Sequence, residues 1–102
     1  MHKIEAFLPP STNVDSLEET LFAAGVVSFS TTEMQVFDRK EMKTVKYRGV
    51  ERVIRHNRKL KLEIIAGKDT IGLAIGALRA YQKKEGIQGV SAFITDLEIF
   101  EN

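Results

Sequence analysis

The 102-residue sequence has no cysteine, which excludes disulfides, cysteine-ligated metal or iron–sulfur sites and a thiol nucleophile. It also has no apolar run near the roughly 20 residues that a membrane-crossing helix needs. The N-terminus, MHKIEAFLPP, has no signal-peptide core. We therefore expect a cytoplasmic protein.

Residues that build catalytic centres are also scarce. The two histidines, His2 and His56, are far apart and form no paired metal-binding motif. There is no Ser-His-Asp spacing and no Walker motif, and the carboxylates are scattered as on a solvated surface. The sequence therefore predicts a binding and signalling protein without a metal site, not an enzyme.

The composition is that of a globular protein, with 43% hydrophobic and 28% charged residues. The length suits one compact domain, so we expect residues 1–102 to form a single unit. The net charge of +1 hides a strong asymmetry. Residues 39–61 hold ten Lys or Arg and two acidic residues, net +8, whereas the rest of the chain is net −7.

The spacing of apolar residues predicts six elements in the order β-α-β-β-α-β. Strands are expected over 3–8, 26–37, 59–65 and 90–100, and helices with apolar stripes over 14–24 and 71–78. Gly72 and Gly76 lie four apart in the second helix and predict a smooth strip for close packing. The pattern favours an α+β, ferredoxin-like fold, with both helices on one face of a four-stranded antiparallel sheet.

Strands two and three are separated by a long basic segment, about residues 38–55, that has no clean period. Charge runs are most often solvated loops, but one of this length in a compact domain favours a function. Its cations suit an anionic ligand or an acidic partner surface. Nucleic acid is disfavoured because the segment has one aromatic residue, Tyr47, and such binders usually stack bases on aromatics of the sheet.

A second candidate for anion binding is the turn that contains Gly86 and Gly89. Two glycines at such a place most often make only a turn. Lys83 and Lys84 come directly before them. The segment therefore also suits a backbone nest for phosphate oxygens.

Residues 36–65, VFDRKEMKTVKYRGVERVIRHNRKLKLEII, resemble the T-loop and following strand of the PII signal-transduction proteins. The matching residues are Phe37, Arg39, Thr44, Tyr47, Arg48, Gly49, Glu51, Val53, Lys59, Lys61, Glu63 and Ile64. The YRG tripeptide in this spacing is the most specific part, and the likeness weakens to pattern after Gly67. The resemblance implies a homotrimer that binds a small anionic effector between subunits. It also implies a mobile T-loop that regulates a membrane transporter or a metabolic enzyme.

The resemblance implies two sets of site residues. The candidate nucleotide-binding residues are Ser30, Phe37, Asp38, Arg39, Lys40, Lys59, Glu63, Ile65, Gly86 and Gly89. The candidate partner-binding residues of the loop are Lys43, Lys46, Tyr47, Arg48, Gly49 and Arg52. For each of them an ordinary strand or loop role remains the alternative interpretation.

Departures from the PII pattern shape the expected ligand. Arg52 replaces a tyrosine that is uridylylated in some members, and Val90 stands near the place of a phosphate-binding lysine. Asp38 and Lys40 replace a glycine and a glutamine beside the usual Mg²⁺ and 2-oxoglutarate site, and a protonated lysine cannot ligate Mg²⁺. The family's C-terminal arginines have no counterpart in this sequence.

We therefore expect an adenine nucleotide with few phosphates, ADP or AMP in preference to ATP, and no need for Mg²⁺ or 2-oxoglutarate. Bicarbonate is the next choice. The alternative function is that of a ferredoxin-like oligomer, structural or related to metal tolerance, that binds no nucleotide.

Overall fold

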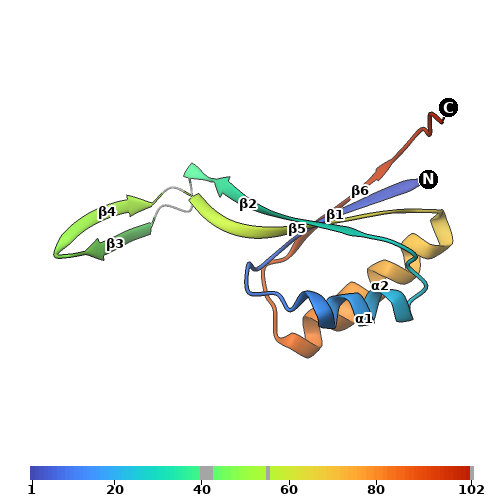
Figure 1. Ribbon diagram of the computed structural model, residues 1–102, viewed down its shortest axis with the longest axis horizontal. Coiled ribbons are helices and arrows are strands. Elements are labelled where there is room, and N and C mark those ends of the chain that lie inside the picture. Colours follow the sequence, from blue (N-terminus) through green and yellow to red (C-terminus); the bar gives the residue numbers. More distant parts are fainter. Residues whose placement is uncertain (40–42, 55, 102) are drawn as a thin grey trace.

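The computed structural model describes residues 1–39, 43–54 and 56–101. Six strands and two helices follow one another along the chain (Figure 1). Their bounds are β1 His2–Leu8, α1 Val14–Ala23, β2 Ser30–Phe37, β3 Lys43–Tyr47, β4 Val50–Ile54, β5 His56–Ala66, α2 Lys68–Glu85 and β6 Ser91–Asp96.

Four strands form one antiparallel sheet in the order β2-β5-β1-β6, and α1 and α2 lie together on one of its faces (Figure 1). We call this sheet with its two helices the body. Strand β5 is central, since its Leu62 lies opposite Ala6 of β1 and Thr31 of β2. The arrangement confirms the predicted ferredoxin-like fold.

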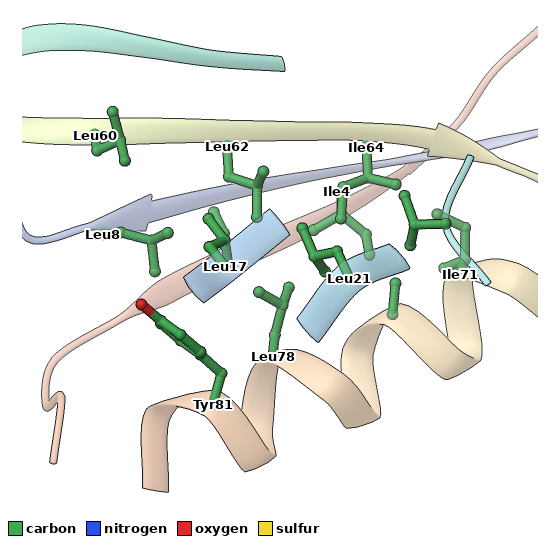
Figure 2. Packing of buried hydrophobic residues seen from close by; sticks show 13 residues of the cluster. Ile4, Leu8, Leu17, Leu21, Leu60, Leu62, Ile64, Ile71, Leu78 and Tyr81 are labelled. Atoms are coloured by element: carbon green, nitrogen blue, oxygen red, sulfur yellow. The ribbon is translucent and has the colours of Figure 1, made fainter. Parts of the chain in front are cut away.

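The core fills the space between the sheet and the helices, as Figure 2 shows. Alternate residues of β1 and β5 point to the helices because successive side chains of a strand project from opposite faces. The buried residues are Ile4, Ala6, Leu8, Leu17, Leu21, Val26, Leu60, Leu62, Ile64, Ile71, Ala74, Leu78 and Tyr81. The alternation predicted the strand members of this set correctly.

Two hydrogen bonds involve Asn13, the residue directly before α1. The Asn13 side chain caps α1 by accepting a hydrogen bond of 3.1 Å from the Ser16 backbone N–H. The buried Tyr81, near the end of α2, donates its hydroxyl to the Asn13 carbonyl oxygen at 3.3 Å. Burial raises the pKa of the Tyr81 hydroxyl above its ordinary value of 10.0. The start of α1 is thus joined to the end of α2.

The predicted close-packing role of Gly72 and Gly76 is wrong. Both residues are exposed, and a Cβ atom built on either would meet nothing within 4 Å. The helix packs through a different face, with Ile71, Ala74 and Leu78 buried. The last strand also ends earlier than predicted, at Asp96, although the Leu97 backbone N–H still donates to the Met1 carbonyl oxygen at 2.9 Å.

The basic segment between β2 and β5 is not irregular throughout, as its lack of period suggested. Strands β3 and β4 pair as an antiparallel hairpin, residues 43–54, which we call the arm. It projects beyond the end of the body that lies opposite the two chain termini (Figure 1). The radius of gyration, 16.4 Å, reflects this projection, since a compact domain of 100 residues has roughly 13 Å.

Candidate functional site

The candidate site lies where β1 ends and β5 continues toward the arm. Strand β1 pairs with β5 only as far as Leu8 opposite Leu60, among the described residues. The chain then turns away at Pro9 and Pro10, which have no backbone N–H to donate to a neighbouring strand. The Thr12 hydroxyl and backbone N–H both donate to the Pro9 carbonyl oxygen, at 2.7 and 3.1 Å. The turn leaves one edge of β5 uncovered.

A hollow of about 310 Å³, which we call the basic hollow, occupies this uncovered edge. Its walls come from the end of β1 and the turn after it, from the start of β5, and from the loop after α2. The lining residues are Phe7, Leu8, Pro9, Pro10, Asn57, Arg58, Lys59, Gln88 and Gly89. Two cations and no carboxylate are among them, so the hollow favours an anion.

A neighbouring hollow of about 440 Å³, which we call the side hollow, is lined by Pro10 and by residues of the paired strands β2 and β5. It shares Pro10, Arg58 and Lys59 with the basic hollow. Unlike the basic hollow it also includes a carboxylate, that of Glu33. The two hollows therefore differ in charge, although they share both cations.

The loop after α2 brings a glycine to the basic hollow. Helix α2 ends at Gly86, whose φ of 66° is left-handed, and Gly89 has a φ of 72°. Ile87 and Val90 pack against the core from the same loop, which holds it in place. Gly89 lines the basic hollow, whereas Gly86 does not. Val90, which the resemblance places near a phosphate-binding lysine of the family, thus packs against the core.

Sequence relatives support the resemblance to PII proteins, although no family model matches the chain. The nitrogen regulatory protein P-II of Cereibacter sphaeroides is 34% identical over 98 residues, which cover 96% of this chain and 87% of that protein. The protein of the same name from Mesorhizobium japonicum gives the same values, and that of Nostoc punctiforme is 29% identical over 98 residues. The chain belongs to the nitrogen regulatory protein P-II family.

Solved structures agree with the P-II assignment. GlnK of B. subtilis matches with a TM-score of 0.67 and 18% sequence identity, over 94% of this chain and 83% of that chain. A complex of B. subtilis GlnK with ATP matches with a TM-score of 0.66 and 19% identity, over 95% and 82% of the two chains. At such identities the likeness shows a shared fold.

The structure separates the predicted P-II nucleotide-binding residues into groups. Lys59 and Gly89 line the basic hollow together. Phe37, Asp38 and Arg39 lie at the end of β2, and none of them lines either hollow. Phe37 is opposite His56 in the sheet and its side chain is 71% exposed. Lys40 lies outside the described residues.

A second group lies on the face of the sheet that carries no helix. Ser30 is opposite Glu63, and Ile65 is half-exposed two residues farther along β5. Lys61 forms an ion pair of 2.8 Å with Glu63, and the hydrogen bond from Lys61 lowers the pKa of the Glu63 carboxyl. The same bond raises the pKa of Lys61. Within one chain, none of Ser30, Glu63 and Ile65 lines the basic hollow.

The predicted partner-binding residues belong to the arm. Arg48, with φ of 52°, and Gly49, with φ of 78°, form the two-residue turn between β3 and β4. Two successive left-handed residues are typical of the tight turn that joins hairpin strands, which gives the YRG tripeptide a structural reason. Lys46 and Arg48 are exposed. Lys43, Tyr47 and Arg52 contribute backbone pairing to the same hairpin.

Seven residues of the basic hollow were not predicted as site residues from the sequence, namely Phe7, Leu8, Pro9, Pro10, Asn57, Arg58 and Gln88. Arg58 was one of the ten cations of residues 39–61, and its position directly before Lys59 is the signal that could have identified it. In the described part of the chain, no group of three metal-binding side chains is found and no helix is long and apolar enough to cross a membrane.

Proposed function

We propose that residues 1–102 act as one P-II-type signalling domain, in which an adenine nucleotide binds at the basic hollow and controls the arm. The observation that carries the proposal is the position of Lys59 on β5, the strand that follows the arm along the chain. Lys59 lines the hollow, and β5 begins at His56 directly beside the arm. A ligand that contacts Lys59 therefore acts five residues along the chain from Ile54, where the arm ends.

The expected ligand has an apolar part and a small anionic group. Phe7, Leu8 and the two prolines offer an apolar wall, while Arg58 and Lys59 offer positive charge. Such a lining suits a nucleotide, which joins a flat apolar base to phosphate. The solved complex of B. subtilis GlnK contains ATP, which supports the choice of an adenine nucleotide. The volume and the two cations favour AMP or ADP over ATP, with bicarbonate as the next choice.

The proposed assembly is a homotrimer. Ile65 on the uncovered face and Phe93 and Ile94 on the edge strand β6 are each more than half exposed. Exposed apolar groups of this kind and an unpaired sheet edge favour association. A trimer would bring the Ser30–Glu63 group of one subunit toward a hollow of the next, which would complete a cleft between subunits. Light scattering should give three times the 11.5 kDa mass of one chain.

The arm is the proposed contact with a regulated partner, either a membrane transporter or a metabolic enzyme. Its cations suit an acidic surface. A ligand changes the arm only if it has unequal affinity for two arm conformations. The action is then an order–disorder or docking switch without catalysis.

Calorimetry with AMP, ADP and ATP, each with and without Mg²⁺, tests the ligand. We expect AMP and ADP to bind without Mg²⁺, and Lys59→Ala to weaken them about tenfold or more because a charge-assisted contact is lost. Lys68→Ala is the matched control, since Lys68 is an exposed lysine at the start of α2 and lines neither hollow.

Two results would contradict this assignment. Tight Mg-ATP binding strengthened by 2-oxoglutarate would show that the expected ligand is wrong. An absence of binding by every nucleotide and by bicarbonate would favour the alternative, a structural or metal-tolerance-related oligomer.

A further inference from the structure

Arg58 and Lys59 project from opposite faces of β5. Side chains alternate along a strand, so Arg58 shares its face with Leu60 and Leu62, which are buried under the helices. Lys59 shares its face with Lys61 and Glu63, on the side without helices. Inside the sheet, two such neighbours could not reach one ligand, because the sheet itself would separate them.

The early end of β1 removes this separation. Beyond Leu60, the β1 side of β5 has no neighbouring strand among the described residues. The basic hollow lies at this uncovered edge, and both Arg58 and Lys59 line it. A group placed there is approached by a cation from each face of the strand. Arg58 and Lys59 can therefore contact the same ligand, although neighbouring residues inside a sheet cannot.

The chemistry of the two cations differs. A guanidinium presents a planar fork of donors that matches two oxygens of a phosphate, whereas an ammonium acts as a compact point charge. Gln88 and Gly89, from the loop after α2, line the same hollow, so it offers polar groups besides the two cations. The apolar wall of Phe7 to Pro10 does not compete for the guanidinium.

The difference in charge between the two hollows indicates which of them favours an anion. Arg58 and Lys59 border both hollows, but Glu33 also lines the side hollow and offsets part of their positive charge there. A negative group is therefore directed to the basic hollow. A longer phosphate chain that extended past Arg58 into the side hollow would approach Glu33, which lines that hollow.

We propose that Arg58 is a specificity-determining residue that binds the terminal phosphate of the nucleotide with two parallel hydrogen bonds. Lys59 neutralises the same group from the other face of β5. The inference rests on the proposed function, since it assumes that a nucleotide occupies the basic hollow. It adds the residue that distinguishes a phosphorylated ligand from a nucleoside.

The test uses the full chain and three variants, Arg58→Gln, Arg58→Lys and Arg79→Gln. Arg79 is an exposed arginine of α2 that lines neither hollow, so its variant controls for loss of one positive charge. The probes are ADP, AMP and adenosine, titrated by calorimetry. Thermal unfolding confirms that each variant is folded, which we expect because Arg58 is exposed.

We expect Arg58→Gln to weaken ADP and AMP about 10- to 100-fold and adenosine by less than about twofold. Arg58→Lys should keep part of the affinity, because it preserves charge but loses the fork. Arg79→Gln should match the unaltered chain. A Glu33→Gln variant should bind ATP more tightly, with little change for AMP.

The outcomes separate the two proposals. If Lys59→Ala weakens ADP binding while Arg58→Gln does not, the nucleotide function stands and the role of Arg58 is rejected. If Arg58→Gln weakens adenosine as much as AMP, Arg58 shapes the hollow and does not bind phosphate, so the inference is also rejected. If the unaltered chain binds none of the three probes, the proposed function itself fails.

Discussion

The body and the arm follow one another along the chain but are held together by different means. In the body, thirteen buried residues fill the space between sheet and helices. In the arm, the described side chains of Lys46, Arg48, Val50 and Glu51 are all exposed, and backbone pairing and a tight turn define the hairpin. Burial makes the body cooperative, whereas an isolated two-stranded hairpin is marginally stable at best. The difference shows how one strand can join a rigid support to an element that is easily reshaped.

The largest expected effect is in the body. Leu62→Ala should lower the free energy of unfolding by about 2–5 kcal/mol, because Leu62 is fully buried and the truncation leaves a cavity. Urea unfolding at one protein concentration measures it. The matched control in the arm is Val50→Ala, at a side chain that is 58% exposed, with an expected change within about 0.5 kcal/mol. Equal losses from both variants would show that arm and body unfold as one packed unit.

A smaller effect, confined to the arm, is expected from Gly49→Ala. The φ of Gly49 is 78°, and a side chain there costs about 1–2 kcal/mol. Amide hydrogen exchange should become faster in residues 43–54 and stay unchanged in β1 and β5. The control is Gly67→Ala, because Gly67 has an ordinary φ of −70° and open space around it. Faster exchange in β1 would contradict the separation of the two regions.

The smallest effect concerns the face of the body without helices. The bond from Lys61 holds the pKa of Glu63 below its ordinary value of 4.5, so the folded state favours the ionised carboxyl. The resulting stability is present above about pH 4.5 and is lost as pH falls through the lowered folded pKa. Unfolding of the unaltered chain and of Glu63→Gln should therefore differ at pH 7 and converge in acid. A difference that stays constant with pH would rule out the ion pair as its cause.

The same contrast explains what could be predicted from the sequence. Strands β1 and β5 were predictable because one face of each is buried, which produces the alternation of Leu60, Leu62 and Ile64 with polar residues. The arm carries no such burial pattern in its described residues, so β3 and β4 were missed. Its turn is also unusual, since Arg48 has a left-handed φ where asparagine or glycine is more common.

The basic hollow was only partly predictable. Lys59 and Gly89 were identified through the resemblance, and the predicted strand over residues 3–8 ends where β1 ends, but no sequence pattern says which residues of β5 lie beyond that end. Without that fact Arg58 and Lys59 belong to opposite faces, and nothing suggests that they border one hollow. For Gly72 and Gly76, by contrast, the sequence suggested a packing role that the structure does not show. Their helical spacing was real, but tertiary packing placed them in open space.

The positions of the two tyrosines give the molecule a natural optical label for each region. The sequence has no tryptophan and two tyrosines, so its intrinsic fluorescence, apart from the weak emission of phenylalanine, comes from Tyr47 and Tyr81. Tyr81 is buried in the body with its hydroxyl on Asn13, and Tyr47 ends the first strand of the arm. Replacing either tyrosine with phenylalanine leaves a single tyrosine whose fluorescence can be followed. Arm movement and body unfolding can therefore be followed separately, without an attached dye.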